Sequence, residues 1–204
     1  MRRLPLLAAL ILLVPGPLLA MGGALAVTPA HAMTAGEASA AIRRAVDEVL
    51  GIINSGRPPA QLYAAFAGVF QRHADVDAIS RSALGPTARQ MDPASFGQFR
   101  EAMTGYIARK YGRRFQEFLG SRIEVGAARP LKSFWAVDST AYLNGRSPMQ
   151  VEWHVSDKTG QPRFFNLIIE GVNMLASERE EINAMLARRK GDVGALIADL
   201  QQAG

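Results

Sequence analysis

Few side chains in this sequence could take part in chemistry, and their spacing argues against a metal or nucleophilic site. His73 and His154 lie far apart, in different predicted elements, and we expect both at the surface. The chain has no cysteine, which excludes thiolate zinc sites, thiol nucleophiles and disulfides. It also lacks the glycine patterns of a nucleophile elbow, a phosphate-binding loop or a dinucleotide site. We therefore predict no catalytic residue, no metal and no cofactor.

Tyr106 or Tyr111 with Asp138 forms the one acid–base pair that would suit an enzyme. Such a pair would have to meet inside a pocket. An enzyme therefore remains an alternative that the structure can test.

A basic run, Arg109, Lys110, Arg113 and Arg114, ends the longest predicted helix. Cations at this place complement the partial negative charge of a helix C-terminus, which is a purely structural explanation. The alternative is a docking surface for anionic head groups or an acidic partner, because aromatic residues flank the run. Both explanations remain open at this stage.

Length, composition and charge indicate one ordinary globular domain. The chain has 204 residues, of which 49% are apolar and 20% charged, with a net charge of +5. Because positive and negative residues are interspersed, this small surplus does not favour nucleic-acid binding.

The first 32 residues have the order of parts of a secretory signal peptide. Two arginines precede an apolar run, Leu4 to Val14, and Ala30-His31-Ala32 fits the small-x-small cleavage rule. An uncleaved anchor is the alternative, because Leu4 to Val27 carries no charge and could span a bilayer. We predict cleavage, export to the periplasm and a single domain over residues 33–204.

Helical signals dominate the first half of this domain and its C-terminal end. Apolar residues at helical spacing, N-cap residues and Gly or Pro stops predict each helix. The predicted helices run from the capping box Thr34–Glu37 to Ile53, Pro58 to Phe70, Asp75 to Leu84, Asp92 to a point before Gly120, Ser177 to Arg189 and Asp192 to Leu200.

Between the helices the hydrophobic period changes to two, which predicts strands. Four strands are expected, at Arg122–Val125, Phe134–Leu143, Val151–Val155 and Arg163–Glu170, with Asn144-Gly145 as a hairpin turn. The predicted fold is α+β: a four-stranded antiparallel sheet covered on one face by about five to six helices.

The apolar positions form two faces that should meet. Val151, Trp153, Phe165, Leu167 and Ile169 share one face of the predicted sheet. The long helix presents the stripe Phe99, Met103, Tyr106 and Ile107. These residues suit either a solid core or the walls of an apolar cavity, and the sequence pattern alone does not distinguish the two.

Several landmarks along the chain resemble the MlaC family, also called the toluene-tolerance auxiliary family. They are Asp75-x-x-x-Ile79-x-x-x-x-Leu84-Gly85, Asp92-Pro93 leading to Phe99 and Tyr111, and Glu170-Gly171-Val172-Asn173-Met174-Leu175 followed by Arg179. The chain departs from the family pattern at Ala88, Asn166, Asn173 and Ile182, and it lacks a tryptophan near Pro162.

The resemblance implies a phospholipid carrier of the periplasm with its cargo in an apolar cavity. Its implied partners are phospholipid, an inner-membrane ABC transporter with MCE domains and an outer-membrane lipoprotein–porin complex. The implied role is maintenance of outer-membrane lipid asymmetry. The alternative is a small-molecule-binding or adaptor protein without lipid cargo. The expected cavity lining adds Leu84, Tyr111, Val172, Met174 and Leu175 to the two faces above.

Overall fold

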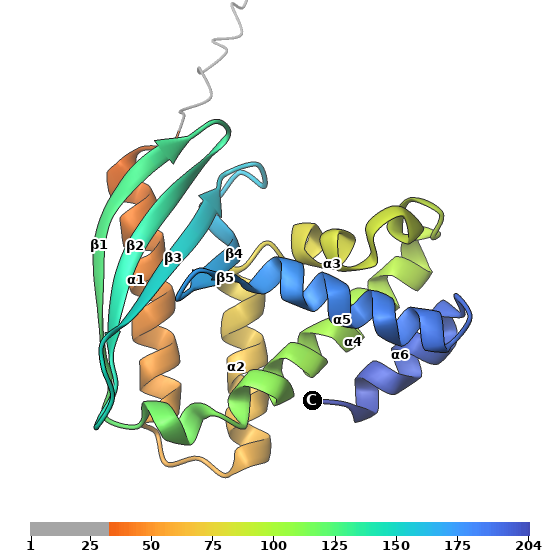
Figure 1. The fold of residues 1–204 in the computed structure, drawn as a ribbon, viewed down its shortest axis with the longest axis horizontal. Coiled ribbons are helices and arrows are strands. Elements are labelled where there is room, and N and C mark those ends of the chain that lie inside the picture. Colours follow the sequence, from red (N-terminus) through yellow and green to blue (C-terminus); the bar gives the residue numbers. More distant parts are fainter. Residues whose placement is uncertain (1–32) are drawn as a thin grey trace, which may run out of the picture. The chain divides into compact units, whose positions relative to one another are not determined.

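The computed structural model describes residues 33–204, and it confirms an α+β fold with an antiparallel sheet (Figure 1). The predicted signal peptide lies outside the described residues. The helices are α1 (Ala35–Ile53), α2 (Pro59–His73), α3 (Val76–Leu84), α4 (Pro93–Gly112), α5 (Met174–Arg188) and α6 (Val193–Gln202), with short 3-10 helices η1 (Gly85–Arg89) and η2 (Phe115–Phe118). The strands are β1 (Arg122–Leu131), β2 (Phe134–Tyr142), β3 (Met149–Ser156), β4 (Arg163–Ile169) and β5 (Val172–Asn173).

The sheet has five strands in sequential order, one more than predicted. The additional strand β5 holds only Val172 and Asn173, which pair with Ile169 and Ile168 of β4. Glu170 and Gly171 connect the two strands with φ values of 48° and 79°, as in a type I′ turn. Glutamate rarely adopts positive φ, so this turn carries no recognisable hairpin signal in the sequence.

Side-chain caps fix where the helices begin. The predicted capping box is present: the Glu37 backbone N–H donates to Thr34 Oγ1, and the Thr34 backbone N–H donates to Glu37 Oε2. Helix α5 begins at Met174, earlier than the predicted Ser177, because Asn173 Oδ1 accepts a hydrogen bond from the Ala176 N–H at 3.0 Å.

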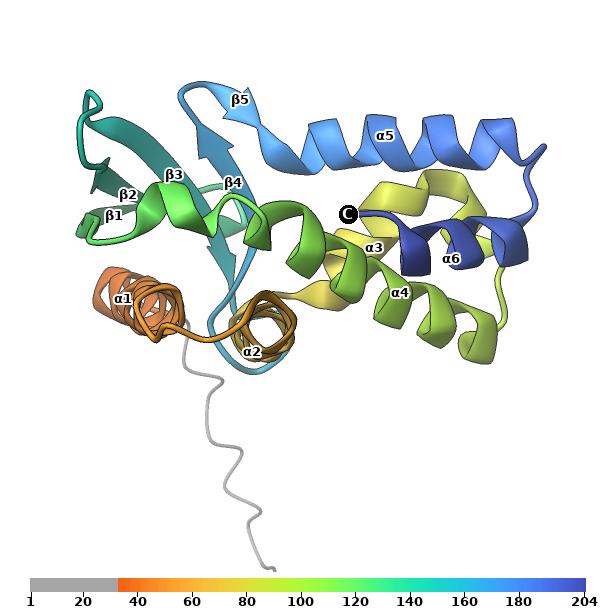
Figure 2. The same cartoon turned by 90° about the horizontal axis from the view of Figure 1, so that it is seen from below.

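The helices do not all cover one face of the sheet. Helix α1 packs across β1, β2 and β3, whereas α3 and α5 contact the sheet at β4. Helix α4 packs mainly on α2 and α6. Figure 2 shows the result: α3, α4, α5 and α6 lie together beyond the β4 edge, and α1 lies against one face of the sheet, below the strands in this view.

A β-bulge in β4 changes the predicted face of one residue. His154 pairs with Asn166 and Val155 with Phe164, so Phe165 is left without a partner on β3. The Phe165 ring lies 5.2 Å from Phe134 and 5.8 Å from His154, on the opposite face from Leu167. The prediction that Phe165 shares a face with Leu167 and Ile169 is therefore wrong.

One contiguous apolar core joins the sheet to the helices. Each of α1, α3, α4, α5, α6, β2 and β3 contributes at least one side chain that is less than 2% exposed. The largest of these side chains are Phe99, Ile42, Leu84, Met103, Ile182, Leu196, Leu200, Val137 and Val155.

A close contact between α2 and α4 depends on a glycine. A Cβ at Gly112 would lie 2.4 Å from Cδ1 of the Tyr63 ring, whereas one at Gly97 in the same helix would meet nothing within 4 Å. Gly112→Ala is expected to destabilise the fold by about 1–3 kcal/mol through overpacking. Gly97→Ala, the matched control, should stabilise it by about 0.5–1 kcal/mol. Urea unfolding of both variants measures the difference, and equal effects would contradict the close packing.

Candidate functional site

One face of the sheet is lined with apolar side chains and turns toward α1. Ser39 Oγ of α1 donates a hydrogen bond to the Gly126 carbonyl of β1 at 3.2 Å, and Trp135 Nε1 of β2 donates to the Met33 carbonyl at 3.1 Å. We call this the inner face. The strand register places on it Ile123, Val125, Ala128, Trp135, Val137, Ser139, Ala141, Val151, Trp153, Val155, Phe164, Leu167 and Ile169.

The two ends of the inner face differ in burial. At one end Val137 and Val155 are completely buried, and the Phe164 ring lies 6.0 Å from that of Phe70 in α2. The other end lies where β1 and β3 begin and β2 and β4 end; Ala141 and Val151 are buried there, but five larger apolar side chains are only partly buried. We call these residues the open strip: Ile123, Val125, Trp153, Leu167 and Ile169.

Two polar side chains beside the open strip, Trp153 and Ser139, are hydrogen-bonded within the sheet. Trp153 Nε1 donates to Ser139 Oγ at 2.8 Å, and Ser139 Oγ donates to the Val151 carbonyl at 3.2 Å. The donors of Trp153 and Ser139 are thus matched within the sheet, so this part of the strip offers mainly apolar contact and little hydrogen-bond specificity.

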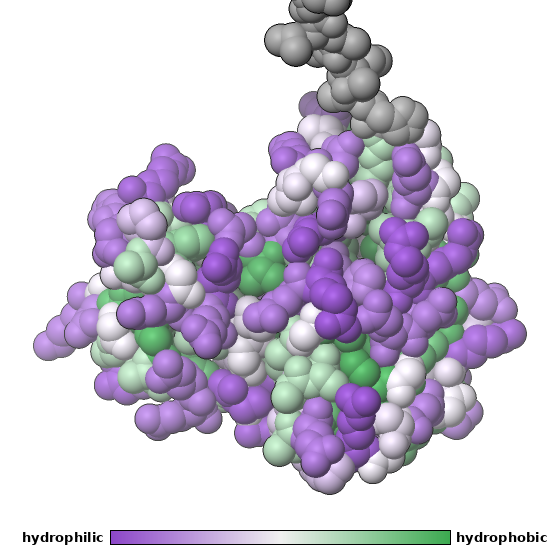
Figure 3. All heavy atoms as spheres, turned by 180° about the vertical axis from the view of Figure 1, so that it is seen from behind, coloured by the Kyte–Doolittle hydropathy of each residue, from purple (hydrophilic) through white to green (hydrophobic). Residues whose placement is uncertain are grey.

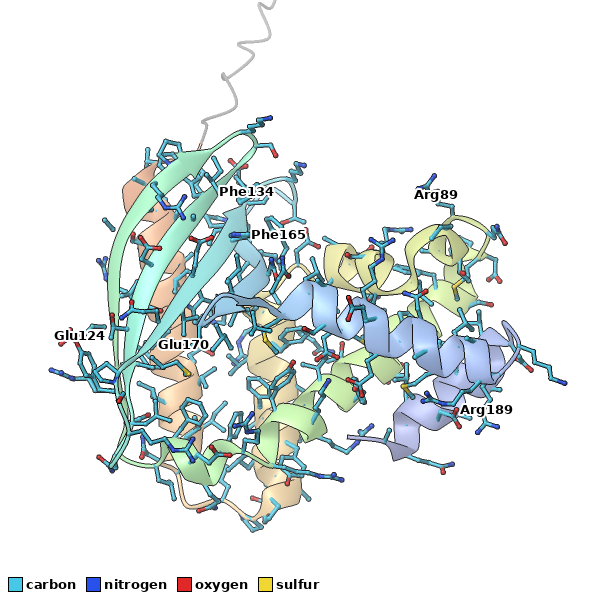
Figure 4. The ribbon with its side chains drawn as sticks, viewed as in Figure 1. Arg89, Glu124, Phe134, Phe165, Glu170 and Arg189 are labelled. Carbon is cyan, nitrogen blue, oxygen red and sulfur yellow. The ribbon has the colours of Figure 1, made fainter. Side chains whose placement is uncertain are left out.

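The structure divides the fourteen residues predicted to line a cavity into three groups. Leu84, Phe99, Met103, Tyr106, Ile107 and Val151 are buried in the packed interior. Tyr111, Trp153, Phe165, Leu167, Ile169, Met174 and Leu175 are half-buried, and Val172 is 54% exposed. Figure 4 shows Phe165 beside Phe134, consistent with the bulge. A ligand that contacts the six buried residues has to displace their present neighbours.

A polar cluster joins α4 to α5 beside these apolar residues. Lys110 Nζ lies 2.7 Å from Glu178 Oε1 and 2.6 Å from Glu181 Oε2. The Tyr106 hydroxyl donates to Glu181 Oε1 at 2.7 Å, and the Tyr111 hydroxyl donates to Glu178 Oε1 at 2.5 Å. Glu178 is 4% exposed, and its Oε2 has no hydrogen-bond partner among the described residues. We call these five residues the α4–α5 cluster.

Burial and charge fix the protonation states of this cluster. Burial, with help from Glu181 and Glu178, raises the pKa of Tyr106 and of Tyr111 well above the usual value, so both hydroxyls stay neutral donors. Burial would lower the pKa of Lys110, but the hydrogen bonds to the two carboxylates outweigh it and raise that pKa. Burial likewise opposes ionisation of Glu181, yet the hydrogen bonds from Lys110 and Tyr106 lower its pKa. Lys110 and Glu181 are therefore charged at neutral pH.

The four residues of the basic run have different surroundings. Lys110 belongs to the α4–α5 cluster, and Arg109 donates from Nε to the Ala203 carbonyl at 2.8 Å, near the end of α6. Both therefore have internal roles. Arg113 and Arg114 are exposed, and Arg114 Nε lies 3.0 Å from Glu117 Oε1. Only these last two are available for docking a partner.

Two surface grooves carry mixed polar and apolar walls. One, of about 480 Å³, lies between α1 and α2, and its lining combines Glu48, Arg57 and Arg72 with Ile52, Val69 and several Ala and Gly residues. The other, of about 450 Å³, lies between α2, α4 and α6, and of the residues singled out from the sequence only Arg109 lines it. Figure 3 shows the rear face, where apolar residues form separate areas among polar ones. Neither groove is the apolar enclosure expected for acyl chains.

The acid–base pair considered for an enzyme does not assemble. Asp138 is exposed on the outer face, opposite the inner face, while Tyr106 and Tyr111 bind the carboxylates of α5. Within residues 33–204, no three His, Asp or Glu side chains are placed to hold a metal ion.

The two histidines are more enclosed than the sequence suggests. His73 Nε2 lies 2.9 Å from Glu48 Oε1, and His154 Nε2 lies 2.8 Å from Glu152 Oε1. Their side chains are 15% and 12% exposed, so both reach the surface but are largely covered.

Sequence reasoning missed Glu178, Glu181 and Asn166. The two glutamates look like ordinary solvent-facing residues of a charged helix, since their partner Lys110 is 68 and 71 residues away. Asn166 stands where the MlaC family usually has aspartate, and this difference was the one signal in the sequence that pointed to the residue.

Comparison with known proteins identifies similar chains. A family described as MlaC protein matches residues 43–202. The solved structure of a phospholipid-binding protein from Ralstonia solanacearum, in complex with a phospholipid, has a similar fold, with a TM-score of 0.70. The two are 20% identical, and the match covers 81% of this chain and 96% of the other. Among residues 33–204, no helix is long and apolar enough to cross a bilayer.

Proposed function

Because this chain belongs to the MlaC family, we propose that it binds a phospholipid with its acyl chains against the open strip and carries it through the periplasm. The observation that supports this proposal is the half-buried apolar strip at the end of an otherwise closed core. The phospholipid complex of the Ralstonia solanacearum protein, which shares the fold, supports the same assignment. We propose a binding and transport protein rather than an enzyme.

The physical need for such a carrier is large. A two-chain phospholipid exposes about 30 methylenes, and each costs about 0.8 kcal/mol in water, so free transfer faces a penalty on the order of 24 kcal/mol. A protein that covers the acyl chains removes most of this penalty. Trp153, Leu167 and Ile169 supply apolar contact without unpaired polar atoms.

Binding in this proposal requires the protein to open. Met103, Ile107 and Val151 are buried against their own neighbours, so acyl chains reach these residues only when the elements that cover them separate. A bilayer solvates acyl chains as well as a protein interior does, so transfer in either direction depends on which state the docked partner stabilises.

The compartment and partners complete the proposal. We propose that residues 1–32 are removed on export and that the chain docks to an inner-membrane ABC transporter with MCE domains and to an outer-membrane lipoprotein–porin complex. Such an exchange would maintain lipid asymmetry of the outer membrane. Fractionation of cells together with the intact mass of the exported chain tests this, since cleavage after Ala32 leaves residues 33–204.

A transfer assay tests the carrier function. The protein is mixed with donor vesicles that contain a radiolabelled phospholipid, separated from them by size and counted before and after incubation with unlabelled acceptor vesicles. We expect label to leave the donor with the protein and to appear in the acceptor. An adaptor protein would take up no label under any of these conditions.

Arg113 and Arg114 provide a test of docking. Arg113→Glu with Arg114→Glu should leave lipid uptake from vesicles unchanged, because both side chains are exposed. Reversing two charges should weaken pull-down of an acidic partner surface by about tenfold or more at low salt. The matched control is the same reversal at Arg43 and Arg44 on the exposed side of α1. If both double variants pull down the partner equally well, the basic run is not part of the docking surface.

A further inference from the structure

A chain of hydrogen bonds crosses the outer face of the sheet and ends at α5. Arg129 of β1 binds Glu152, and Glu152 Oε1 lies 2.8 Å from His154 Nε2. His154 Nδ1 lies 3.3 Å from Asn166 Nδ2, and Asn166 Oδ1 accepts the Leu175 backbone N–H at 3.0 Å. Asn166 is 6% exposed, so water has little access to its amide.

The chemistry of these groups allows only one pattern of protons. A backbone N–H can only donate, so the Asn166 atom that faces Leu175 must be the oxygen. The amide nitrogen, a donor, therefore faces His154 Nδ1, which has to be an acceptor without a proton. The neutral ring then carries its proton on Nε2 and donates it to Glu152.

Protonation of His154 breaks this pattern. The new Nδ1–H would face the N–H₂ group of Asn166, donor against donor. If the Asn166 amide turns over to accept from the ring, its N–H₂ group faces the Leu175 N–H instead. In either arrangement one hydrogen bond in a site with little access to water is lost.

Among residues 33–204, the Asn166 amide is the only hydrogen-bond partner of His154 Nδ1. The charged groups near it are Glu152 on its own strand, Arg129 of β1 behind Glu152, and Asp138 of β2, which pairs with Glu152 in register and is exposed. Phe134 of β2 and Phe165 of β4 cover the ring, with centroids 4.7 and 5.8 Å away. Figure 4 shows these two phenylalanines close together.

We propose that His154 and Asn166 form a proton-sensitive latch that holds the amino end of α5 to β4 when His154 is neutral and weakens this hold when His154 is protonated, because the Asn166 amide can then satisfy only one of its two partners. The loosened turn contains Met174 and Leu175, and Leu175 packs against the main core. Acid should then also lower lipid retention. This consequence rests on the proposed function, whereas the latch itself does not.

Nuclear magnetic resonance on ligand-free residues 33–204 tests the latch directly. The ¹⁵N signals of the neutral His154 ring should identify the form with the proton on Nε2. Between about pH 8 and about pH 5, across the range where histidine protonates, the protection factor of the Leu175 amide against hydrogen exchange should fall about tenfold. A proton on Nδ1 in the neutral ring, or equal protection at both pH values, would overturn the proposal.

Two variants and one control separate the latch from other effects of acid. In Asn166→Asp the carboxylate accepts from both the Leu175 N–H and a protonated ring, so the pH dependence of Leu175 should disappear. In His73→Gln, the control at the other enclosed histidine, it should remain. In His154→Gln the side-chain amide still offers one acceptor and one donor but does not titrate, so the pH dependence of Leu175 should disappear as in Asn166→Asp. A pH dependence that survives in both Asn166→Asp and His154→Gln would contradict the latch. If the Leu175 amide shows the expected pH dependence but the protein binds no lipid, the result would count against the proposed function and not against the latch.

Discussion

Leu167→Arg is expected to remove nearly all bound phospholipid while the protein remains folded. Leu167 belongs to the open strip, lies beside Trp153 on the inner face of β4, and is only half-buried. In the complex, an acyl chain would press against this side chain and exclude water from it. An arginine there would lose its hydration without a partner, which costs several kcal/mol. We expect at least about a tenfold loss of retained lipid per folded chain.

The matched control places the same residue on the other face of the sheet. Gln150 of β3 is exposed, and Glu170 lies beside it because the Glu170 carboxylate accepts the Gln150 backbone N–H. Gln150→Arg should therefore fold and retain lipid as the unaltered chain does. Lipid extracted from equal amounts of each protein, with circular dichroism to confirm folding, measures the difference. A folded Leu167→Arg protein with undiminished lipid would refute the inner-face assignment.

Lys110→Met is expected to cause the largest loss of stability. Methionine keeps the length of the side chain but removes the cation between Glu178 and Glu181. Glu178 has a side chain only 5% exposed, so its carboxylate would be left buried without a counter-charge. Breaking such a pair costs about 3 kcal/mol. For a chain of this size, this corresponds to a fall in Tm of roughly 6–12 °C.

A double variant shows whether the unpaired charge is the cause. Lys110→Met combined with Glu178→Leu removes both charges and should recover most of the lost stability, because apolar replacements of buried ion pairs are often neutral. Thermal unfolding of the two variants and of the unaltered chain gives the comparison. If the double variant is less stable than Lys110→Met, the packing around Lys110 matters more than its charge.

The α4–α5 cluster should also weaken in acid. The pKa of Glu181 is lowered in the folded state, chiefly by hydrogen bonds from Lys110 and Tyr106 that outweigh its burial. A lowered folded-state pKa means that the contribution to stability is complete above the unfolded value of 4.5 and is lost as the pH falls through the folded value.

Local signals in the sequence were sufficient to place most elements. The capping box Thr34–Glu37 and the N-cap Asp92 followed by Pro93 depend on neighbouring residues only, and both are present as predicted. The alternation at Val151, Trp153 and Val155 identified a strand with one apolar face, and β3 has that arrangement. Short-range patterns of this kind are independent of the partner segment.

Features that depend on distant partners were not predictable. The bulge at Phe165 exists only in relation to β3, and it reverses the face of a residue whose alternation looked regular. The ion pairs of Lys110 form across 68 and 71 residues and turned an expected docking residue into an internal one. The same limit applies to the choice between core and cavity: burial shows that six expected lining residues are packed against protein side chains.

Native mass spectrometry of the exported chain tests the central claim most directly. The protein is purified without detergent, sprayed from a volatile buffer and then measured again after extraction with organic solvent. We predict a species heavier than residues 33–204 by the mass of one phospholipid, which disappears on extraction and is absent from Leu167→Arg. A bare protein mass in repeated preparations, unchanged after incubation with phospholipid vesicles, would contradict the account.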